Sequence, residues 1–229
     1  MIDRWIDQSM HNTYMTTEEK IIQLNKVAQE IKDFKGLDIA KNANHAVPGE
    51  GNPDAQIMMI GEAPGQVEDS TGRPFVGQSG QMMAKVLTGV TGLKREEVFI
   101  TNIVKYRPPE NRDPSIEEIS ACKNWLNRQI AIIQPRIIVT LGRFSMAKFI
   151  PDVTISQVHG PPRFFKFSTI NHELTNYEPI IFPMYHPAAA LRGTTVMNIF
   201  KDDFLKLKSL LVQKTKIEDN KLHGQLDIF

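Results

Sequence analysis

Residues 56–65 read QIMMIGEAPG, and this stretch decides the fold. The apolar run Gln56–Ile60 predicts a short buried strand. Gly61, Pro64 and Gly65 follow at once, and two glycines with a proline predict a tight turn whose backbone amides face a ligand. The alternative is an ordinary turn from strand to loop.

Strands and helices alternate on either side of this segment. Helical patterns lie at Thr16–Phe34, Gln78–Thr88, Asp113–Ile133 and Thr195–Leu211, and further apolar strands at Val98–Lys105, Arg136–Leu141 and Ile180–Tyr185. This alternation predicts an α/β fold with a mostly parallel sheet covered on both faces, in which loops at the carboxyl ends of the strands form the ligand crevice. Residues 158–167, VHGPPRFFKF, are a candidate hairpin or edge strand.

Local signals set several boundaries in this plan. Thr16 followed by Glu19 is a capping-box pattern, and Asp113 with Pro114 supplies an N-cap and first-turn start for a helix. Residues 36–53 are rich in Gly, Asn and Pro, which predicts an irregular connection.

Composition restricts the class of protein. The chain has 229 residues, 41% hydrophobic and 23% charged, which fits one domain, expected over residues 1–212. Its first residues contain neither a signal peptide nor an apolar span, so we expect a cytoplasmic monomer with no membrane contact. A net charge of +1 neither favours nor excludes DNA. Cys122 is the only cysteine, which excludes an intrachain disulfide and any site that needs several thiolates.

Three recognition groups follow three predicted strands. Phe75 lies in a Gly- and Pro-containing loop, where an aromatic ring can stack on a base; alternatively, it plugs the edge of the core. Asn102 places a donor and an acceptor side by side, as the edge of a pyrimidine requires, or it satisfies loop backbone. His186 emerges where a strand becomes a turn, and histidine can donate a hydrogen bond to a leaving group.

Basic residues flank the same strand ends. Four of them are candidates for contact with DNA phosphates, and the alternative for each is a solvated surface cation: Lys105, Arg107, Arg112 and Arg192.

Taken together, the sequence resembles family 4 of the uracil-DNA glycosylase superfamily, the bacterial and archaeal type. Blocks similar to those of the family occur in order at similar spacing: GEGNPDA (49–55), GEAPGQVED (61–69), GRPFVGQSG (72–80), TNIVKYRPPENRDP (101–114) and HPAAALR (186–192). The resemblance covers residues 20–210. It implies a three-layer α/β/α sandwich around a four-stranded, mostly parallel sheet.

The resemblance also implies a reaction and a role for each group. The reaction is hydrolysis of the N-glycosidic bond of deoxyuridine in DNA, after the nucleotide is flipped into a pocket. Uracil-containing DNA is therefore the expected partner. The pocket would be bordered by the turn, with Phe75 stacking on the base, Asn102 reading its polar edge and His186 stabilising the departing base; the turn residues are Gly61, Ala63 and Gly65.

The sequence does not decide which residue activates the attacking water. Ala63 stands where the best-known members of the superfamily place an aspartate. Glu62 and Glu68 remain as catalytic candidates that could orient the water.

The sequence departs from family 4 at its metal cluster. The family holds a four-iron cluster on four cysteines, and the matching positions here are Phe34, Leu37, Tyr106 and Cys122. Three replaced thiolates predict that the iron–sulfur cluster is absent, that no other metal or cofactor takes its place, and that the four side chains pack together.

The C-terminus carries a separate motif. Residues 213–229 are predicted to be a flexible tail that ends in QLDIF, close to the QL(S/D)LF pentapeptide by which bacterial proteins bind the sliding clamp. Leu226, Ile228 and Phe229 would enter an apolar pocket while Gln225 bonds at its rim. The alternative is a tail docked on its own domain.

Three classes of function compete. The first is an active uracil-DNA glycosylase that starts base excision repair, and the second is a non-catalytic DNA- or clamp-binding protein of the same fold. The third is a protein that acts on free nucleotides, and it is disfavoured because neither a Walker-type nor a GxGxxG pattern follows the first strand.

Overall fold

The computed structural model describes residues 15–164 and 177–223. For residues 164 and 213–223 it describes the backbone alone. The predictions for the QLDIF tail lie outside the described residues.

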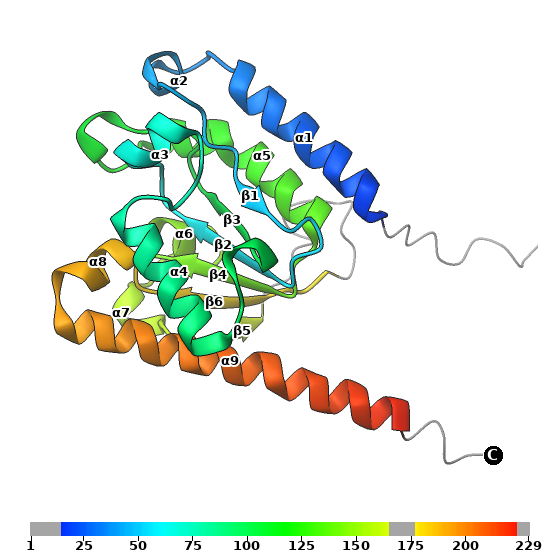
Figure 1. Cartoon of the computed structure of the whole chain (residues 1–229). Helices are drawn as coiled ribbons and strands as arrows, with labels where there is room; N and C mark the ends of the chain where they lie inside the picture. Colours follow the sequence, from blue (N-terminus) through cyan, green and yellow to red (C-terminus); the bar gives the residue numbers. More distant parts are fainter. Residues whose placement is uncertain (1–14, 165–176, 224–229) are drawn as a thin grey trace, which may run out of the picture.

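One six-stranded sheet runs through the molecule in the order β1-β3-β2-β4-β6-β5 (Figure 1). The four middle strands are parallel, and the two-residue edge strands β1 and β5 are antiparallel to their neighbours. The parallel four-stranded centre predicted above is therefore confirmed. The strands are β1 Glu50–Gly51, β2 Ile57–Gly61, β3 Phe99–Asn102, β4 Ile137–Leu141, β5 Arg163–Phe164 and β6 Ile180–Met184.

Helices cover both faces of this sheet. The α-helices are α1 Thr17–Asp33, α2 Asp38–Asn42, α3 Gln66–Thr71, α4 Gln78–Thr91, α5 Ile116–Ile133, α6 Arg143–Ala147, α7 Ile155–Val158, α8 Pro187–Arg192 and α9 Thr194–His223. Two short 3₁₀ turns, η1 Arg95–Glu97 and η2 Pro109–Asn111, lie in the connections.

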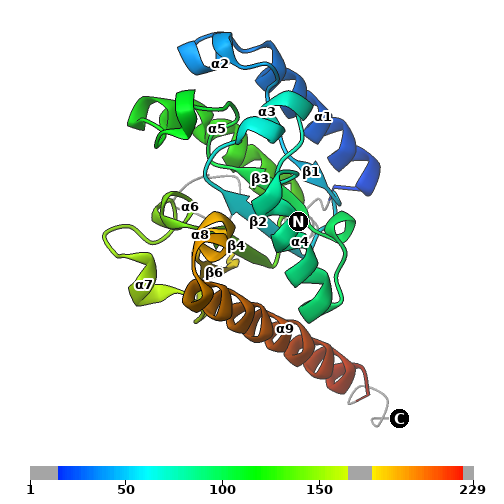
Figure 2. The same ribbon diagram turned by 60° about the vertical axis from the view of Figure 1, so that its left-hand side comes forward.

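Strand alternation divides the interior into two cores. In β2, Met58 and Ile60 point to a core shared with α1 and α5, whereas Ile57 and Met59 point to a core shared with α4 and α9. The helices lie accordingly on opposite sides of the sheet (Figures 1 and 2). A strand buried on both faces explains the continuous apolar run, and the result is the predicted three-layer α/β/α sandwich.

Some boundaries differ from the sequence predictions. Ser115, not Asp113, caps α5, because its side chain accepts the Glu118 amide while Glu118 accepts the Ser115 amide. The predicted irregular connection contains α2 and β1. Helix α9 continues beyond the expected end at Leu211 to His223.

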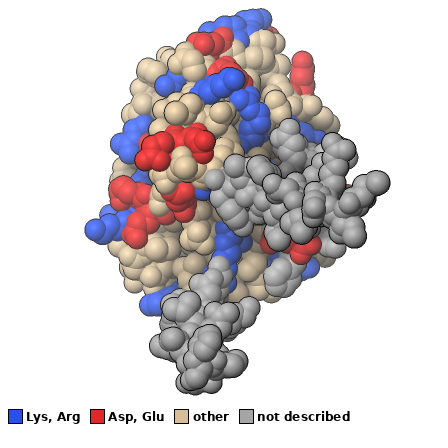
Figure 3. Space-filling model, turned by 90° about the vertical axis from the view of Figure 1, so that its right-hand side faces the viewer, with Lys and Arg blue, Asp and Glu red and all other residues tan. Residues whose placement is uncertain are grey.

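Surface charge is mixed on the face shown in Figure 3, where Lys and Arg lie among Asp and Glu. Within residues 15–164 and 177–223, no helix has the length and apolar character needed to cross a membrane.

Candidate active site

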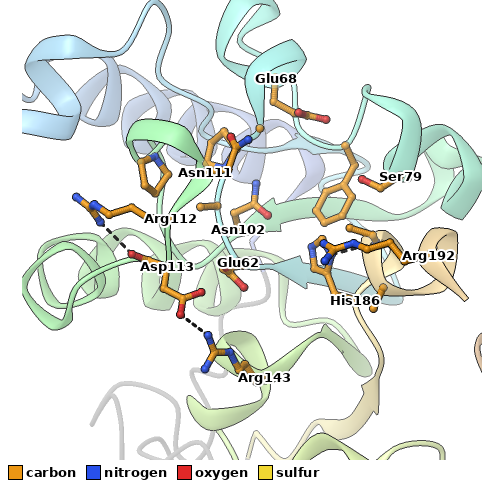
Figure 4. A pocket seen from close by; sticks show the side chains of 17 residues that line it. Glu62, Glu68, Ser79, Asn102, Asn111, Arg112, Asp113, Arg143, His186 and Arg192 are labelled. Carbon is orange, nitrogen blue, oxygen red and sulfur yellow. Dashed lines mark hydrogen bonds and ion pairs between the residues drawn. The ribbon is translucent and has the colours of Figure 1, made fainter. Parts of the chain in front are cut away.

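A cavity of about 570 Å³ opens at the carboxyl ends of the parallel strands (Figure 4). This is the position expected for a ligand in an α/β sheet, because the loops diverge there. Nine of the residues singled out in the sequence line it: Glu62, Ala63, Gly65, Glu68, Phe75, Asn102, Arg112, His186 and Arg192.

Asn102 ends strand β3 and lines this cavity with a polar side chain. It is 1% exposed, and its Oδ1 has no hydrogen-bond partner among the described residues. A buried acceptor without a partner is unfavourable unless a ligand satisfies it. The expected alternative, in which this amide satisfies nearby loop backbone, therefore leaves Oδ1 unexplained.

Gly61 lets two side chains meet at the floor of the cavity. A Cβ atom on Gly61 would lie 2.4 Å from Asn102 Oδ1 and 2.4 Å from Phe75 Cζ. Only a residue without a side chain permits this approach. Phe75 is buried at 6% exposure, so it belongs to the core and to the cavity wall at once.

His186 occupies the N-cap of α8, and its Nδ1 accepts the Ala188 amide at 3.2 Å. Burial, and secondarily Arg192, lowers the pKa of His186 to about 4, although Glu68 opposes the shift. The ring is therefore neutral at pH 7. Because Nδ1 accepts a hydrogen bond, the proton is on Nε2, which remains a donor without a partner among the described residues.

Glu62 follows β2 directly and is half-buried in the cavity wall. The amides of Ile103 and Val104 donate to the carbonyls of Gly61 and Glu62 at 3.0 Å, which fixes this loop against the chain after β3. Burial raises the pKa of the Glu62 carboxyl, Asp113 raises it further and Arg143 opposes the shift. Figure 4 shows Glu62 between Asn102 and Arg143.

Glu68 lies on the opposite side of the cavity, on helix α3 (Figure 4). Its Oε1 accepts the amides of Val76 and Gly77 at 2.9 and 2.8 Å. Both bonds go to the loop that carries Phe75, so this carboxylate is already engaged by backbone.

Three arginines lie at the rim, although the sequence analysis singled out only two of them. Arg112 pairs with Glu118 at 2.7 Å and Arg143 pairs with Asp113, whereas Arg192 is exposed at the end of α8. Each side chain lines the cavity and leaves a guanidinium within reach of solvent. Arg107 does not line the cavity and donates to Asn111 Oδ1 at 2.9 Å.

Lys105 is placed differently from the prediction. It is 0% exposed, and its ammonium donates to Thr101 Oγ1 at 2.6 Å, Gln129 Oε1 at 2.8 Å and the Asn102 carbonyl at 2.9 Å. Burial lowers the pKa of Lys105 to about 7. A fully buried ammonium cannot reach a phosphate, so the expected phosphate contact is wrong, and Lys105 instead supports the backbone of Asn102.

Sequence reasoning missed several residues of the cavity. Arg143 could have been found by the rule used for the other sites, since it follows strand β4 after Gly142. Ser79, Asn111 and Asp113 carried no comparable signal, because helix and loop geometry brings them to the cavity.

The four positions that match cluster cysteines lie in one apolar core. Phe34 stacks on Tyr106 with ring centroids 6.2 Å apart and meets Trp125 edge-on at 5.1 Å. The Tyr106 hydroxyl donates to the Ile31 carbonyl at 2.6 Å, and Cys122 is buried beside them. These side chains offer one thiol, so they do not fit a four-iron cluster.

A model of the uracil DNA glycosylase superfamily matches residues 48–208, so the chain belongs to this superfamily. The matched segment contains every strand described above and the whole cavity.

Three named relatives indicate the branch of the superfamily to which the chain is similar. The chain is 44% identical to a type-4 uracil-DNA glycosylase of Saccharolobus solfataricus over 209 residues, which are 89% of this chain and 94% of that protein. It is 43% identical to the type-4 enzyme of Sulfurisphaera tokodaii, over 82% and 85% of the two chains. A third, of Archaeoglobus fulgidus, is 39% identical over 83% and 94%. The resemblance to family 4 is thus confirmed.

Proposed function

We propose that the chain is a uracil-DNA glycosylase that removes uracil from DNA by hydrolysing its N-glycosidic bond. The observation that carries the proposal is the buried, unpartnered Oδ1 of Asn102 beside Phe75 in the cavity. Uracil presents an N–H donor next to a carbonyl acceptor, and the Asn102 amide offers the complementary pair. The type-4 names of the relatives support the same activity.

The cavity suits the charge that develops in this reaction. When the bond between uracil N1 and the sugar C1′ breaks, the electron pair stays on the base, and the oxygen of water bonds to C1′. The proton that the water loses passes to a nearby carboxylate or to solvent, and the uracil anion regains a proton from solvent. The Nε2–H of neutral His186 and the Asn102 amide donate to the uracil anion. Fixed donors of this kind stabilise a transition state without reorganising.

Glu62 is the better candidate to orient the attacking water. Its carboxyl is half-buried in the wall, it has no hydrogen bond among the described residues, and its raised pKa makes the ionised form a stronger base. Glu68 has one oxygen engaged by two amides, which leaves it less free for this role.

DNA phosphates would be held at the rim. Arg112, Arg143 and Arg192 surround the mouth of the cavity, so they can contact the backbone on either side of a flipped nucleotide. Arg107 remains a candidate farther from the mouth.

The decisive experiment is a gel assay on a single-stranded oligonucleotide with one uracil, followed by alkaline cleavage of abasic sites. We expect cleavage at uracil and none in the same oligonucleotide with thymine. Binding of the oligonucleotide without cleavage would instead support the non-catalytic alternative.

We further propose that the chain folds without an iron–sulfur cluster, since Phe34, Leu37 and Tyr106 take three of the four ligand positions. Protein purified anaerobically should contain less than stoichiometric iron and lack visible iron–sulfur absorbance. Bound iron with such absorbance would refute this proposal.

The proposed partner of the C-terminal QLDIF segment is the sliding clamp of bacterial replication. Removal of residues 225–229 should abolish clamp binding and leave excision of uracil from a short oligonucleotide unchanged. We also propose a monomer, which size-exclusion chromatography with light scattering tests.

A further inference from the structure

Phe75 has a backbone conformation that its residue type disfavours. Its φ is +51°, in the left-handed region that residues with a Cβ seldom adopt. The residue is neither glycine nor asparagine, so surrounding groups must hold it there. The ring of Phe75 is the stacking surface in the proposed function, and its direction depends on this conformation.

A cation holds the carbonyl side of the Phe75 loop. Arg95, in η1, donates from Nη1 to the Phe75 carbonyl at 3.0 Å and from Nη2 to the Pro74 carbonyl. The same guanidinium bonds Glu50 from Nε at 3.1 Å and Nη2 at 2.8 Å. Because its side chain is only 16% exposed, Arg95 is fixed between the loop and β1.

An anion holds the amide side of the same loop. Glu68 Oε1 accepts from Val76 and Gly77, the two residues that follow Phe75. Hydrogen bonds to an ionised partner are about twice as strong as those between neutral groups. The Pro74 carbonyl belongs to the peptide plane before Phe75, and the Phe75 carbonyl and the Val76 amide belong to the plane after it. The two charged side chains therefore hold both peptide planes that the φ and ψ bonds of Phe75 connect.

We propose that Arg95 and Glu68 are positioning residues that lock the left-handed Phe75 and so aim its ring across Gly61 toward the base. This inference rests on the proposed function and deepens it. Arg95 acts through Phe75 and does not line the cavity. The sequence analysis gave Glu68 as a candidate to orient the attacking water. Under this proposal Glu68 instead holds the backbone of the Phe75 loop.

Arg95→Gln tests the cation, with Arg73→Gln as the matched control. Arg73 bonds the same Glu50 at 2.8 Å and makes no hydrogen bond to the loop carbonyls. Stacking of a base on an aromatic ring corresponds to roughly a five- to 150-fold effect, so we expect Arg95→Gln to lower kcat/KM about tenfold. Arg73→Gln should stay within about twofold of the parent, because the Arg73 side chain is exposed and its loss leaves the hydrogen bonds to the loop carbonyls in place.

A double-mutant cycle separates positioning from mere stability. In a Phe75→Ala background, Arg95→Gln should have less than about a twofold further effect, since Arg95 acts through the ring that is gone. Loss of Arg95 should raise the DNA concentration that gives the half-maximal rate and leave the maximal single-turnover rate unchanged, because the base stacks on Phe75 before the N-glycosidic bond breaks. A misfolded fraction would lower the maximal rate instead. An equal loss in both backgrounds would overturn the proposal.

Glu68 is tested by two substitutions. Glu68→Gln keeps an oxygen that accepts both amides, whereas Glu68→Ala removes it, so Gln should retain at least about tenfold more activity than Ala. Equal inactivity of both variants would mean that the charge acts on water and would refute the positioning role. Absence of uracil excision by the parent chain would refute the proposed function itself, a separate result.

Discussion

Replacing Gly61 with alanine should disable the cavity while leaving the rest of the fold intact. The added Cβ would lie 2.4 Å from Asn102 Oδ1, 2.4 Å from Phe75 Cζ and 2.6 Å from Phe75 Cε2. Ordinary contact begins at 3.4 Å, so at least one of the two side chains must move by about 1.0 Å. Neither is free to do so, since Asn102 is fully buried and Phe75 is held by Arg95.

The expected magnitude follows from that displacement. A misplacement of about 1 Å at a reacting centre lowers a rate by about a hundredfold. Overpacking a filled site also destabilises a protein by about 1–3 kcal/mol. We therefore expect Gly61→Ala to excise uracil about a hundredfold more slowly in single-turnover assays, with a lowered Tm that still permits folding at 25 °C.

Gly89→Ala is the matched control. Gly89 is exposed within helix α4, and a Cβ there would meet nothing within 4 Å. The same substitution should stabilise this helix by about 0.5–1 kcal/mol and leave excision unchanged. If Gly61→Ala cleaved within about twofold of the parent, Asn102 and Phe75 would not meet over Gly61, and the account of the cavity floor would be wrong.

Other predictions concern the remaining groups. His186→Ala and Asn102→Ala should each lower the excision rate by roughly 10²–10³, the usual loss for one fixed donor, and near-parental rates in both would refute the site. Nuclear magnetic resonance of the His186 ring should show a titration midpoint near pH 4 and a proton on Nε2. The excision rate should show no step near pH 6.5, since the neutral form of His186 already dominates above the lowered pKa. A titration midpoint near 6.5 would contradict the burial of this ring. Tyr106→Phe removes the bond to the Ile31 carbonyl and should destabilise the protein by about 0.5–1.5 kcal/mol in denaturant titrations with activity retained, whereas an unchanged midpoint would mean that this bond contributes nothing.

The parallel sheet could be predicted because its strands are buried on both faces. Such strands appear as uninterrupted apolar runs, and β2, β4 and β6 were each found within one or two residues. The edge strands are two residues long, too short for any pattern to form. Strand β3 ends at Asn102, earlier than the apolar composition suggested.

Helix α5 shows how competing local signals are decided. Asp113-Pro114 predicted the start of this helix, whereas in the structure the helix begins after Ser115, whose reciprocal capping box with Glu118 was not singled out in the sequence. Asp113 is thereby released to pair with Arg143 at the rim. Sequence alone does not reveal which of two adjacent caps will be used.

Candidate site residues that directly follow strands could be predicted from the sequence. Residues whose role depends on their burial in the fold could not. Lys105 looks like a surface cation in the sequence, yet its acceptors come from Thr101, Pro48 and Gln129, which only the fold brings together. The holding role of Arg95 was equally hidden, because its partners are backbone carbonyls twenty residues away in the chain.

The ring contacts among Phe34, Tyr106 and Trp125 join helix α1 to the rest of the domain through packed side-chain atoms alone. With the cluster absent, as we propose, oxidants and iron chelators would leave this junction intact. We therefore expect uracil excision to persist after treatment with oxidants or iron chelators.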